Sequence, residues 1–466
     1  MPDTFIDDKE IFSLLHKERH ASVSRIEEVI SRARTMKGLE PIDVAALLSV
    51  EDEDVWQEIF CLAKEIKNNI YGNRIVLFAP LYTSNRCAND CAYCGFRRSN
   101  EKITRHTLST DDIAQEVLAL ENAGHKRLLM VYGEHPAYGI NYIAKTIETA
   151  YRTKASDGRG EIRRININAA PMEKGEYEIL KKIGIGTYQV FQETYHKDRY
   201  ADIHPDHTIK GDYHKRLYTL HQAQEAKLDD VGIGVLFGLY DWRFEVMGIL
   251  AHSMELEKQF GVGPHTISFP RLEPAINTPF YDETPYHVSD EDLKKIVAII
   301  RLMVPYTGMI LTAREKPVLR RELMHLGVSQ IDGGSRIDVG GYHRNGIDGD
   351  LHKQQFTIYD NRSLDDIVRE LAHDGFIPSF CTACYRSNRT GERFMQMAKS
   401  VGTKGLCHPN AILTFYEYIL DYASDETHKI GKKLIQDNLS KQSPDERCII
   451  EKSMADLDEG KRDEFF

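Results

Sequence analysis

The stretch RIVLFAPLYTSNRCANDCAYCGFRR, residues 74–98, decides the predicted fold. Its first nine residues form an apolar run with the length and composition of a buried β-strand. The loop-like sequence that follows holds three cysteines within eight residues, Cys87, Cys91 and Cys94. In parallel barrels, functional side chains follow the carboxyl ends of the strands. The stretch therefore predicts a strand that ends in a ligand-bearing loop.

Seven further β-rich apolar runs follow, separated by amphipathic segments such as residues 110–124 and 289–304. The runs occupy residues 127–133, 163–169, 187–193, 231–239, 265–272, 308–313 and 327–332. Alternating strands and helices predict βαβ units and a parallel sheet. Eight such units over about 260 residues match the count and size of a (β/α)8 barrel. An open doubly wound sheet is the alternative, but no glycine-rich dinucleotide-binding loop follows the first run.

The segments on either side of the barrel complete the predicted organisation. Residues 1–73 carry apolar side chains at three- and four-residue spacing, which is typical of amphipathic helices. Residues 346–466 contain a second cysteine group and then charged, helical sequence. The prediction is an α/β chain with an N-terminal helical segment (1–73), a TIM-type barrel (74–345) and a mainly helical C-terminal iron–sulfur domain (346–466).

Charge and cysteine usage restrict the class of protein. A net charge of −11 argues against a nucleic-acid-binding protein, since phosphate binding requires a basic face. No basic, apolar leader and no apolar stretch of about 20 residues is visible, so we expect a cytoplasmic protein with no membrane contact. In a reducing compartment, clustered cysteines more often bind metal than form disulfides. Cys61 and Cys448 stand alone in helical stretches and are expected to be buried.

The first cysteine group has one ligand fewer than a structural zinc site, which is almost always closed by four. Within twenty residues after Cys94 the only further cysteine or histidine is His106. Thiolates also suit iron–sulfur clusters. A cluster held by three thiolates keeps one iron open for a substrate or cofactor, whereas a zinc ion remains the alternative.

The spacing C-x3-C-x2-C, followed by GFRR at residues 95–98, resembles the signature of radical S-adenosyl-L-methionine (SAM) enzymes. The resemblance implies a 4Fe-4S cluster whose open iron binds the amino and carboxylate groups of SAM. Reduction of the bound sulfonium then releases a 5′-deoxyadenosyl radical. By the same resemblance, Tyr93 packs on the adenine, Gly133 and Glu134 bind the methionine amino group, and Glu193 is a further SAM contact.

A second cysteine group, Cys381, Cys384 and Cys407, has the spacing C-x2-C-x22-C. By itself this spacing also fits a zinc knuckle completed by His408. Together with YGEHP, FQETYH and GVGPHTIS in the barrel, the tail resembles the HydG family, the radical SAM tyrosine lyases of FeFe-hydrogenase maturation. The resemblance extends from about residue 70 to Phe466. The tyrosine lyase of thiazole biosynthesis shares the barrel motifs but lacks this tail spacing, so the tail favours the HydG family.

The resemblance to that family implies a specific reaction. The radical takes a hydrogen from the amino group of L-tyrosine, and the Cα–Cβ bond breaks to give p-cresol and dehydroglycine. Dehydroglycine yields carbon monoxide and cyanide at a second 4Fe-4S cluster with a labile fifth iron, which builds an iron–carbonyl–cyanide unit. The implied partners are a low-potential electron donor and a scaffold GTPase as product acceptor.

Two needs of this reaction point to further residues. A buried carboxylate requires a fixed cation, and arginine offers two parallel hydrogen bonds. Arg314, at the end of the seventh run, is the first choice, and Arg271 is the second; Glu273 also follows the sixth run. A labile iron requires a neutral imidazole. The resemblance indicates His252, with His265 as the rival.

Two other functions stay open at this point. One is the thiazole-pathway lyase, in which the tail cysteines are a relic or bind zinc. The other is a non-catalytic iron–sulfur protein that stores or passes electrons or iron. Glu134, Glu193 and Arg314 argue against the second, because a carrier needs no substrate-binding groups.

Overall fold

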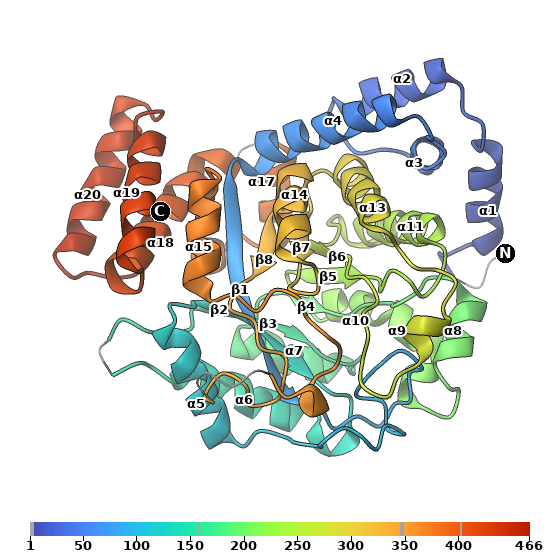
Figure 1. Cartoon of the computed structure of the whole chain (residues 1–466), viewed down its shortest axis with the longest axis horizontal. Coiled ribbons are helices and arrows are strands. Elements are labelled where there is room, and N and C mark those ends of the chain that lie inside the picture. The colour runs from blue at the N-terminus through green and yellow to red at the C-terminus, as the bar shows by residue number, and fades with distance from the viewer. Residues whose placement is uncertain (1–3, 157, 345–348, 401–402) are drawn as a thin grey trace.

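Eight parallel strands close into a barrel at the centre of the molecule (Figure 1). The computed structural model describes residues 4–156, 158–344, 349–400 and 403–466. The strands are β1 (Arg74–Ser84), β2 (Arg127–Tyr132), β3 (Arg164–Asn168), β4 (Tyr188–Gln189), β5 (Val231–Gly234), β6 (Thr266–Ser268), β7 (Gly308–Leu311) and β8 (Gln330–Asp332). Strand β1 pairs with both β2 and β8, which closes the sheet. The predicted (β/α)8 barrel is confirmed, and each predicted run contains one strand.

Helices surround the barrel and cover its amino-terminal end. Those between strands are α5 (Thr110–Asn122), α6 (Ile140–Arg152), α7 (Lys174–Ile183), α8 (Lys197–Ile203), α9 (Tyr213–Leu217), α10 (Thr219–Glu225), α11 (Trp242–Phe260), α12 (Phe280–Glu283), α13 (Asp290–Met303) and α14 (Pro317–Leu326). Ser109 and Ser289 are the N-caps of α5 and α13, and each forms a capping box with the aspartate three residues later. The N-terminal helices are α1 (Asp8–Lys17), α2 (Val23–Ala33), α3 (Pro41–Leu47) and α4 (Glu53–Tyr71), and α4 packs against α13 and α14 (Figure 1).

A ninth strand, β9 (Ile377–Ser379), was not expected from the sequence. It pairs in parallel with the start of β1, where Arg74 lies opposite Ile377 and Val76 opposite Ser379. Val76 pairs with β8 on one side of β1, so β9 must lie on the other side. Strand β2 lies on that same side but pairs with β1 only from Ala79 onward. A strand of three residues is too short to show an alternating hydrophobic pattern in the sequence. Its central proline is compatible with a strand at the edge of a sheet.

The remaining tail is helical, as predicted. Its helices are α15 (Leu364–His373), α16 (Ala383–Arg386), α17 (Gly391–Lys399), α18 (Thr403–Asp421), α19 (Asp425–Leu439) and α20 (Pro444–Asp458). Short 3-10 turns lie at Pro136–Tyr138, Ile209–Gly211 and Leu351–Lys353. The predicted domain boundary at 345/346 lies outside the described residues.

Cys61 and Cys448 are both exposed, so the prediction that they are buried is wrong. The apolar face of α4 includes Trp56, Ile59 and Leu62, and Cys61 lies on the opposite, solvent-facing side. In the described part of the chain, no helix is long and apolar enough to cross a membrane.

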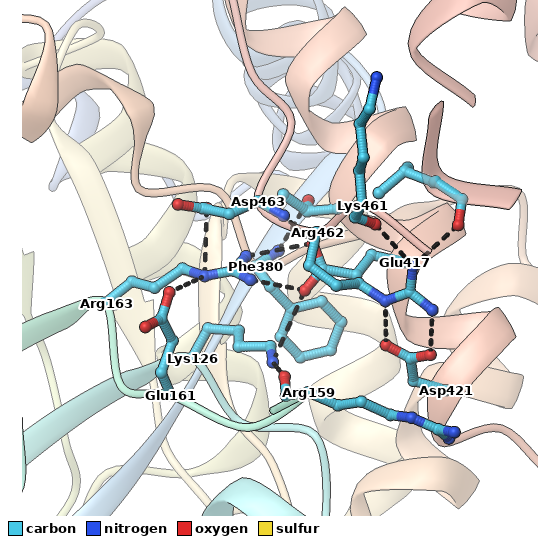
Figure 2. A network of polar contacts seen from close by, with 12 residues as sticks. Lys126, Arg159, Glu161, Arg163, Phe380, Glu417, Asp421, Lys461, Arg462 and Asp463 are labelled. Atoms are coloured by element: carbon cyan, nitrogen blue, oxygen red, sulfur yellow. Dashed lines mark hydrogen bonds and ion pairs between the residues drawn. The ribbon is translucent and has the colours of Figure 1, made fainter. Parts of the chain in front are cut away.

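A buried network of ion pairs holds the tail against the barrel (Figure 2). Arg163, just before β3, places Nη2 2.6 Å from Oε1 of Glu417 on α18 and Nε 3.1 Å from Oδ1 of Asp463. Lys126 Nζ lies 3.6 Å from the same Glu417 oxygen. The side chains of Arg163 and Glu417 are 4% and 3% exposed, so neither charge can be satisfied by water if its partner is lost.

We expect Glu417→Ala to lower the free energy of unfolding by about 3–5 kcal/mol, because Arg163 and Lys126 both lose the buried carboxylate that they share. The matched control is Glu451→Ala, which removes an exposed pair with Arg447 on α20 and should cost less than about 1 kcal/mol. Urea unfolding followed by circular dichroism measures both. Equal, small effects would show that the network does not stabilise the tail.

Candidate active site

A cavity of about 1470 Å³ opens at the carboxyl ends of the barrel strands. Most of the residues that the sequence predicts for the radical site line this upper cavity, namely Cys87, Cys91, Cys94, Tyr93, Gly133, Glu134, Glu193 and Arg314.

The chemistry of the upper cysteines fits an iron–sulfur cluster. Burial raises the pKa of Cys87 and of Cys91, the latter to about 12, so the thiolates require a bound cation. Gln355 Nε2 donates a hydrogen bond to Cys94 Sγ at 3.4 Å. No histidine and no fourth cysteine lines the upper cavity among the described residues. Nor do any three described His, Cys, Asp or Glu side chains converge on a point that would hold a single metal ion, whereas a cluster takes each thiolate on a different iron.

Ionic and hydrogen-bonding groups surround the side of the cavity next to Tyr93. Glu193 Oε1 lies 2.6 Å from Lys210 Nζ and 3.3 Å from Arg216 Nη2. Burial alone would raise the pKa of Glu193, but these two cations lower it, so the carboxylate stays ionised. The hydroxyl of Tyr93 lies 2.9 Å from His204 Nε2 and 3.1 Å from Lys210 Nζ. Tyr93 is therefore fixed at the wall of the cavity.

The loop after β2 contacts the cysteine loop directly. Asn89 Nδ2 donates to Glu134 Oε2 at 2.6 Å, and the amide of Ala88 donates to the Glu134 carbonyl at 2.7 Å. Gly133 lies so close that an added Cβ would overlap the carbonyl oxygen of Arg86, the residue before Cys87. Only glycine allows this contact between the two loops.

The two candidate arginines have different surroundings. Arg314 lines the upper cavity, donates from Nη1 to the Arg271 carbonyl at 3.1 Å and forms no ion pair with any described residue. Arg271 does not line it, because both sides of its guanidinium are occupied: Nε lies 3.1 Å from Glu315 Oε1 and Nη1 lies 2.9 Å from Asp290 Oδ1. Arg314 is therefore the available cation, and the structure does not place Arg271 where a ligand carboxylate would bind.

Some lining residues gave no signal in the sequence. Lys210 and Arg216 lie well beyond the end of β4, and Gln355 and Phe356 come from the predicted C-terminal domain. Phe356 packs on Arg314, whose guanidinium carbon lies 3.3 Å from the ring centre. Their contribution depends on tertiary structure, which no local spacing encodes.

The tail cysteines lie at the opposite, amino-terminal end of the barrel. Cys381, Cys384 and Cys407 line a lower cavity of about 650 Å³, and His408 does not line it. A hydrogen bond from Cys384 lowers the pKa of Cys407 to about 6 and raises that of Cys384. Arginines also line the lower cavity, namely Arg74, Arg127 and Arg389. Three thiols beside several cations fit an anionic iron–sulfur cluster.

His265, the rival candidate, lines the lower cavity with these cysteines, whereas His252 does not. His265 Nδ1 lies 3.3 Å from Asp230 Oδ1, so a carboxylate adjoins the ring as it does in many metal sites, although the two atoms form no hydrogen bond. His252 lies on α11, where its Nδ1 is 2.9 Å from the Tyr195 hydroxyl and its ring centre 5.1 Å from that of Phe5. As an isolated histidine on a buried helix face, it has the surroundings of a core residue.

We expect Gly133→Ala to reduce the iron retained after reconstitution, because the new methyl group pushes Arg86 and the adjoining cysteine loop out of place. Gly139→Ala is the matched control, since a Cβ at that position meets no atom within 4 Å. Iron and sulfide analysis compares the two variants. Equal iron contents would show that the loop tolerates the displacement.

Comparison with known proteins agrees with this geometry. The Radical SAM superfamily model matches residues 81–247, and the Biotin and Thiamin Synthesis associated domain matches residues 268–377. The 2-iminoacetate synthase of Salmonella typhimurium is 32% identical over 355 residues, which cover 75% of this chain and 89% of that protein.

Two solved structures match almost the whole chain. A crystal structure of HydG, a maturase of the [FeFe]-hydrogenase, is 49% identical with a TM-score of 0.95, and the match covers 99% of this chain and 100% of that one. HydG from Carboxydothermus hydrogenoformans is 39% identical with a TM-score of 0.84, over 96% and 97% of the two chains. The superfamily match implies a 4Fe-4S cluster and SAM as cofactors. The chain therefore belongs to the HydG family of radical SAM enzymes.

Proposed function

We propose that this enzyme cleaves the Cα–Cβ bond of L-tyrosine to p-cresol and dehydroglycine, and converts dehydroglycine to carbon monoxide and cyanide for a hydrogenase active site. One observation carries the proposal: two groups of three cysteines line two cavities at opposite ends of one barrel. A single radical reaction requires only the upper group. The second group, with a histidine beside it, supports a second chemical step.

In the upper cavity, Cys87, Cys91 and Cys94 would hold the cluster, and Tyr93 and Glu134 would contact SAM. When bound, this cofactor pair supplies the radical that takes a hydrogen atom from the substrate. Arg314 binds the tyrosine carboxylate, since its cation has no ionic partner among the described residues. The surrounding apolar wall excludes water from the reactive fragment.

In the lower cavity, Cys381, Cys384 and Cys407 would hold the second 4Fe-4S cluster, and His265 would bind its labile fifth iron. Asp230 supports this role, because its carboxylate lies 3.3 Å from Nδ1 of His265 and a carboxylate beside a ring nitrogen is typical of metal-binding imidazoles. The pair would supply the iron on which the carbon monoxide and cyanide ligands collect. The buried arginines Arg74 and Arg127 balance the negative charge of the thiolates.

The wider context of this proposal comes from the HydG relatives, which mature the [FeFe]-hydrogenase. A scaffold GTPase would accept the iron–carbonyl–cyanide product, and a low-potential protein would donate electrons. The likeness to 2-iminoacetate synthase supports a second candidate, a lyase that stops at the imine. The two candidates differ in whether carbon monoxide is formed.

The reconstituted, reduced protein with SAM and tyrosine is expected to release p-cresol, measured by chromatography. A matched reaction with phenylalanine controls for SAM cleavage that is not coupled to tyrosine. SAM cleavage without p-cresol would rule out both lyase functions.

Cys384→Ala is expected to abolish carbon monoxide and cyanide while p-cresol formation stays within about twofold of the parent enzyme, because the altered residue lies at the other end of the barrel. Trapping of carbon monoxide by deoxymyoglobin measures the first product. Carbon monoxide that survives the substitution would contradict the role of the lower cavity.

His265→Ala is expected to remove the labile iron and carbon monoxide formation, whereas His252→Ala should retain both. Iron counting on the reconstituted variants measures this difference. The opposite result would restore His252 as the ligand.

A further inference from the structure

Glu273 is a buried carboxylate at the upper cavity for which the function above gives no role. It follows β6, is 7% exposed and lines both the upper cavity and an adjoining cavity of about 680 Å³. Arg314 follows the neighbouring strand β7 and also lines both cavities. Two oppositely charged groups on adjacent strand ends therefore face the same space.

The other carboxylates of the upper cavity already have partners. Glu193 pairs with Lys210 and Arg216, Asp332 Oδ1 lies 3.0 Å from Arg320 Nη2, and Glu134 accepts from Asn89. Glu273 forms no ion pair with any described residue, Arg314 included, and the Tyr359 hydroxyl lies within hydrogen-bonding range of its carboxylate. It is thus the carboxylate available to a positively charged ligand group.

The groups that face Glu273 set its proton affinity near neutrality. Burial raises the pKa of Glu273 to about 7, and the Glu315 carboxylate acts in the same direction. Arg314, Arg271 and the Tyr359 hydroxyl oppose this rise. Tyr281, on α12, also lies within electrostatic range of Glu273. A carboxylate of this kind can both bind a cation and accept a proton at neutral pH.

We propose that Glu273 binds the α-ammonium group of the amino-acid substrate and removes one proton from it before the radical step. This inference rests on the proposed function, in which a hydrogen atom is taken from the amino nitrogen. The α-amino group of a peptide titrates at about pH 8 and that of a free amino acid higher, because its own carboxylate stabilises the cation, so the substrate arrives mainly as the ammonium ion. Its nitrogen has no lone pair to conjugate with the radical and favour cleavage of the neighbouring bond.

The step is a simple proton transfer. One N–H bond breaks with its electron pair left on nitrogen, and one O–H bond forms on Glu273. No oxidant or reductant is needed. Arg314 holds the substrate carboxylate at the same time, so the two residues together recognise a zwitterion, and the proton leaves through the adjoining cavity.

The central test is Glu273→Gln, which keeps the shape of the side chain but cannot take the proton. We expect p-cresol formation at pH 7 to fall at least about 100-fold, the usual contribution of a general base. The parent enzyme should lose activity below about pH 7, as Glu273 becomes protonated. The residual rate of the variant should instead rise with pH as free amine accumulates. A rate within threefold of the parent, with an unchanged pH profile, would overturn the inference.

Two neighbouring substitutions should move the acidic limb of the parent profile in opposite directions. Glu315→Gln removes a nearby negative charge, which lowers the pKa of Glu273 and shifts the limb to lower pH. Tyr359→Phe removes a hydrogen bond to the carboxylate and shifts the limb to higher pH. These variants keep the inference testable if Glu273→Gln does not fold, and shifts in the same direction would contradict it.

Binding provides a readout that does not depend on turnover. Tyrosine should bind the parent enzyme at least tenfold more tightly than 3-(4-hydroxyphenyl)propionate, which lacks the amino group, and Glu273→Gln should remove this preference. An unchanged preference in the variant would contradict the ammonium contact. Absence of p-cresol from the parent enzyme would instead refute the proposed function, so the two failures are distinguishable.

Discussion

Both cysteine sites depend on the pairing of one strand, β1, along its whole length. At its start β1 holds β9, whose end leads to Cys381, and at its other end it continues into the loop of Cys87. From Val76, opposite the end of β9, to Ser84 there are eight residue steps, or about 26 Å at 3.3 Å per residue. The length of β1 therefore sets the distance between the two cysteine groups, which line two separate cavities.

The distribution of buried charge divides the molecule into structural and functional parts. Where the tail meets the barrel, Arg163 and Glu417 neutralise one another, and Arg271 is held by Glu315 in the same way. Such pairs fix positions and leave no charge free for a ligand. Glu273 is buried and Arg314 is half-buried, yet neither has an ionic partner among the described residues. Under the proposed function, these are the charges with which a zwitterionic substrate would pair.

The sequence allowed the barrel and the upper site to be predicted because both depend on local patterns. Strand–helix alternation and the spacing of Cys87, Cys91 and Cys94 are visible within short windows. Strand β9 was missed because three residues are too few to show the alternation of apolar and polar side chains that identifies a strand. Arg271 stayed a candidate because the sequence does not reveal its ion pair with Glu315, which joins residues 44 apart. The sequence also could not decide between His252 and His265, since only the folded barrel shows that His265 lines the cavity of the tail cysteines.

The connection of the tail through β9 also orders the assembly of the protein. All three upper cysteines and all eight barrel strands precede residue 333, whereas the lower site requires Cys407 from α18. Because domains generally fold in the order of their synthesis, the barrel can close before the tail cysteines of the lower site leave the ribosome. The upper cysteines can thus be in place on a nascent chain while the lower site does not yet exist. Maturation of the two sites becomes sequential in time, even though they belong to one polypeptide.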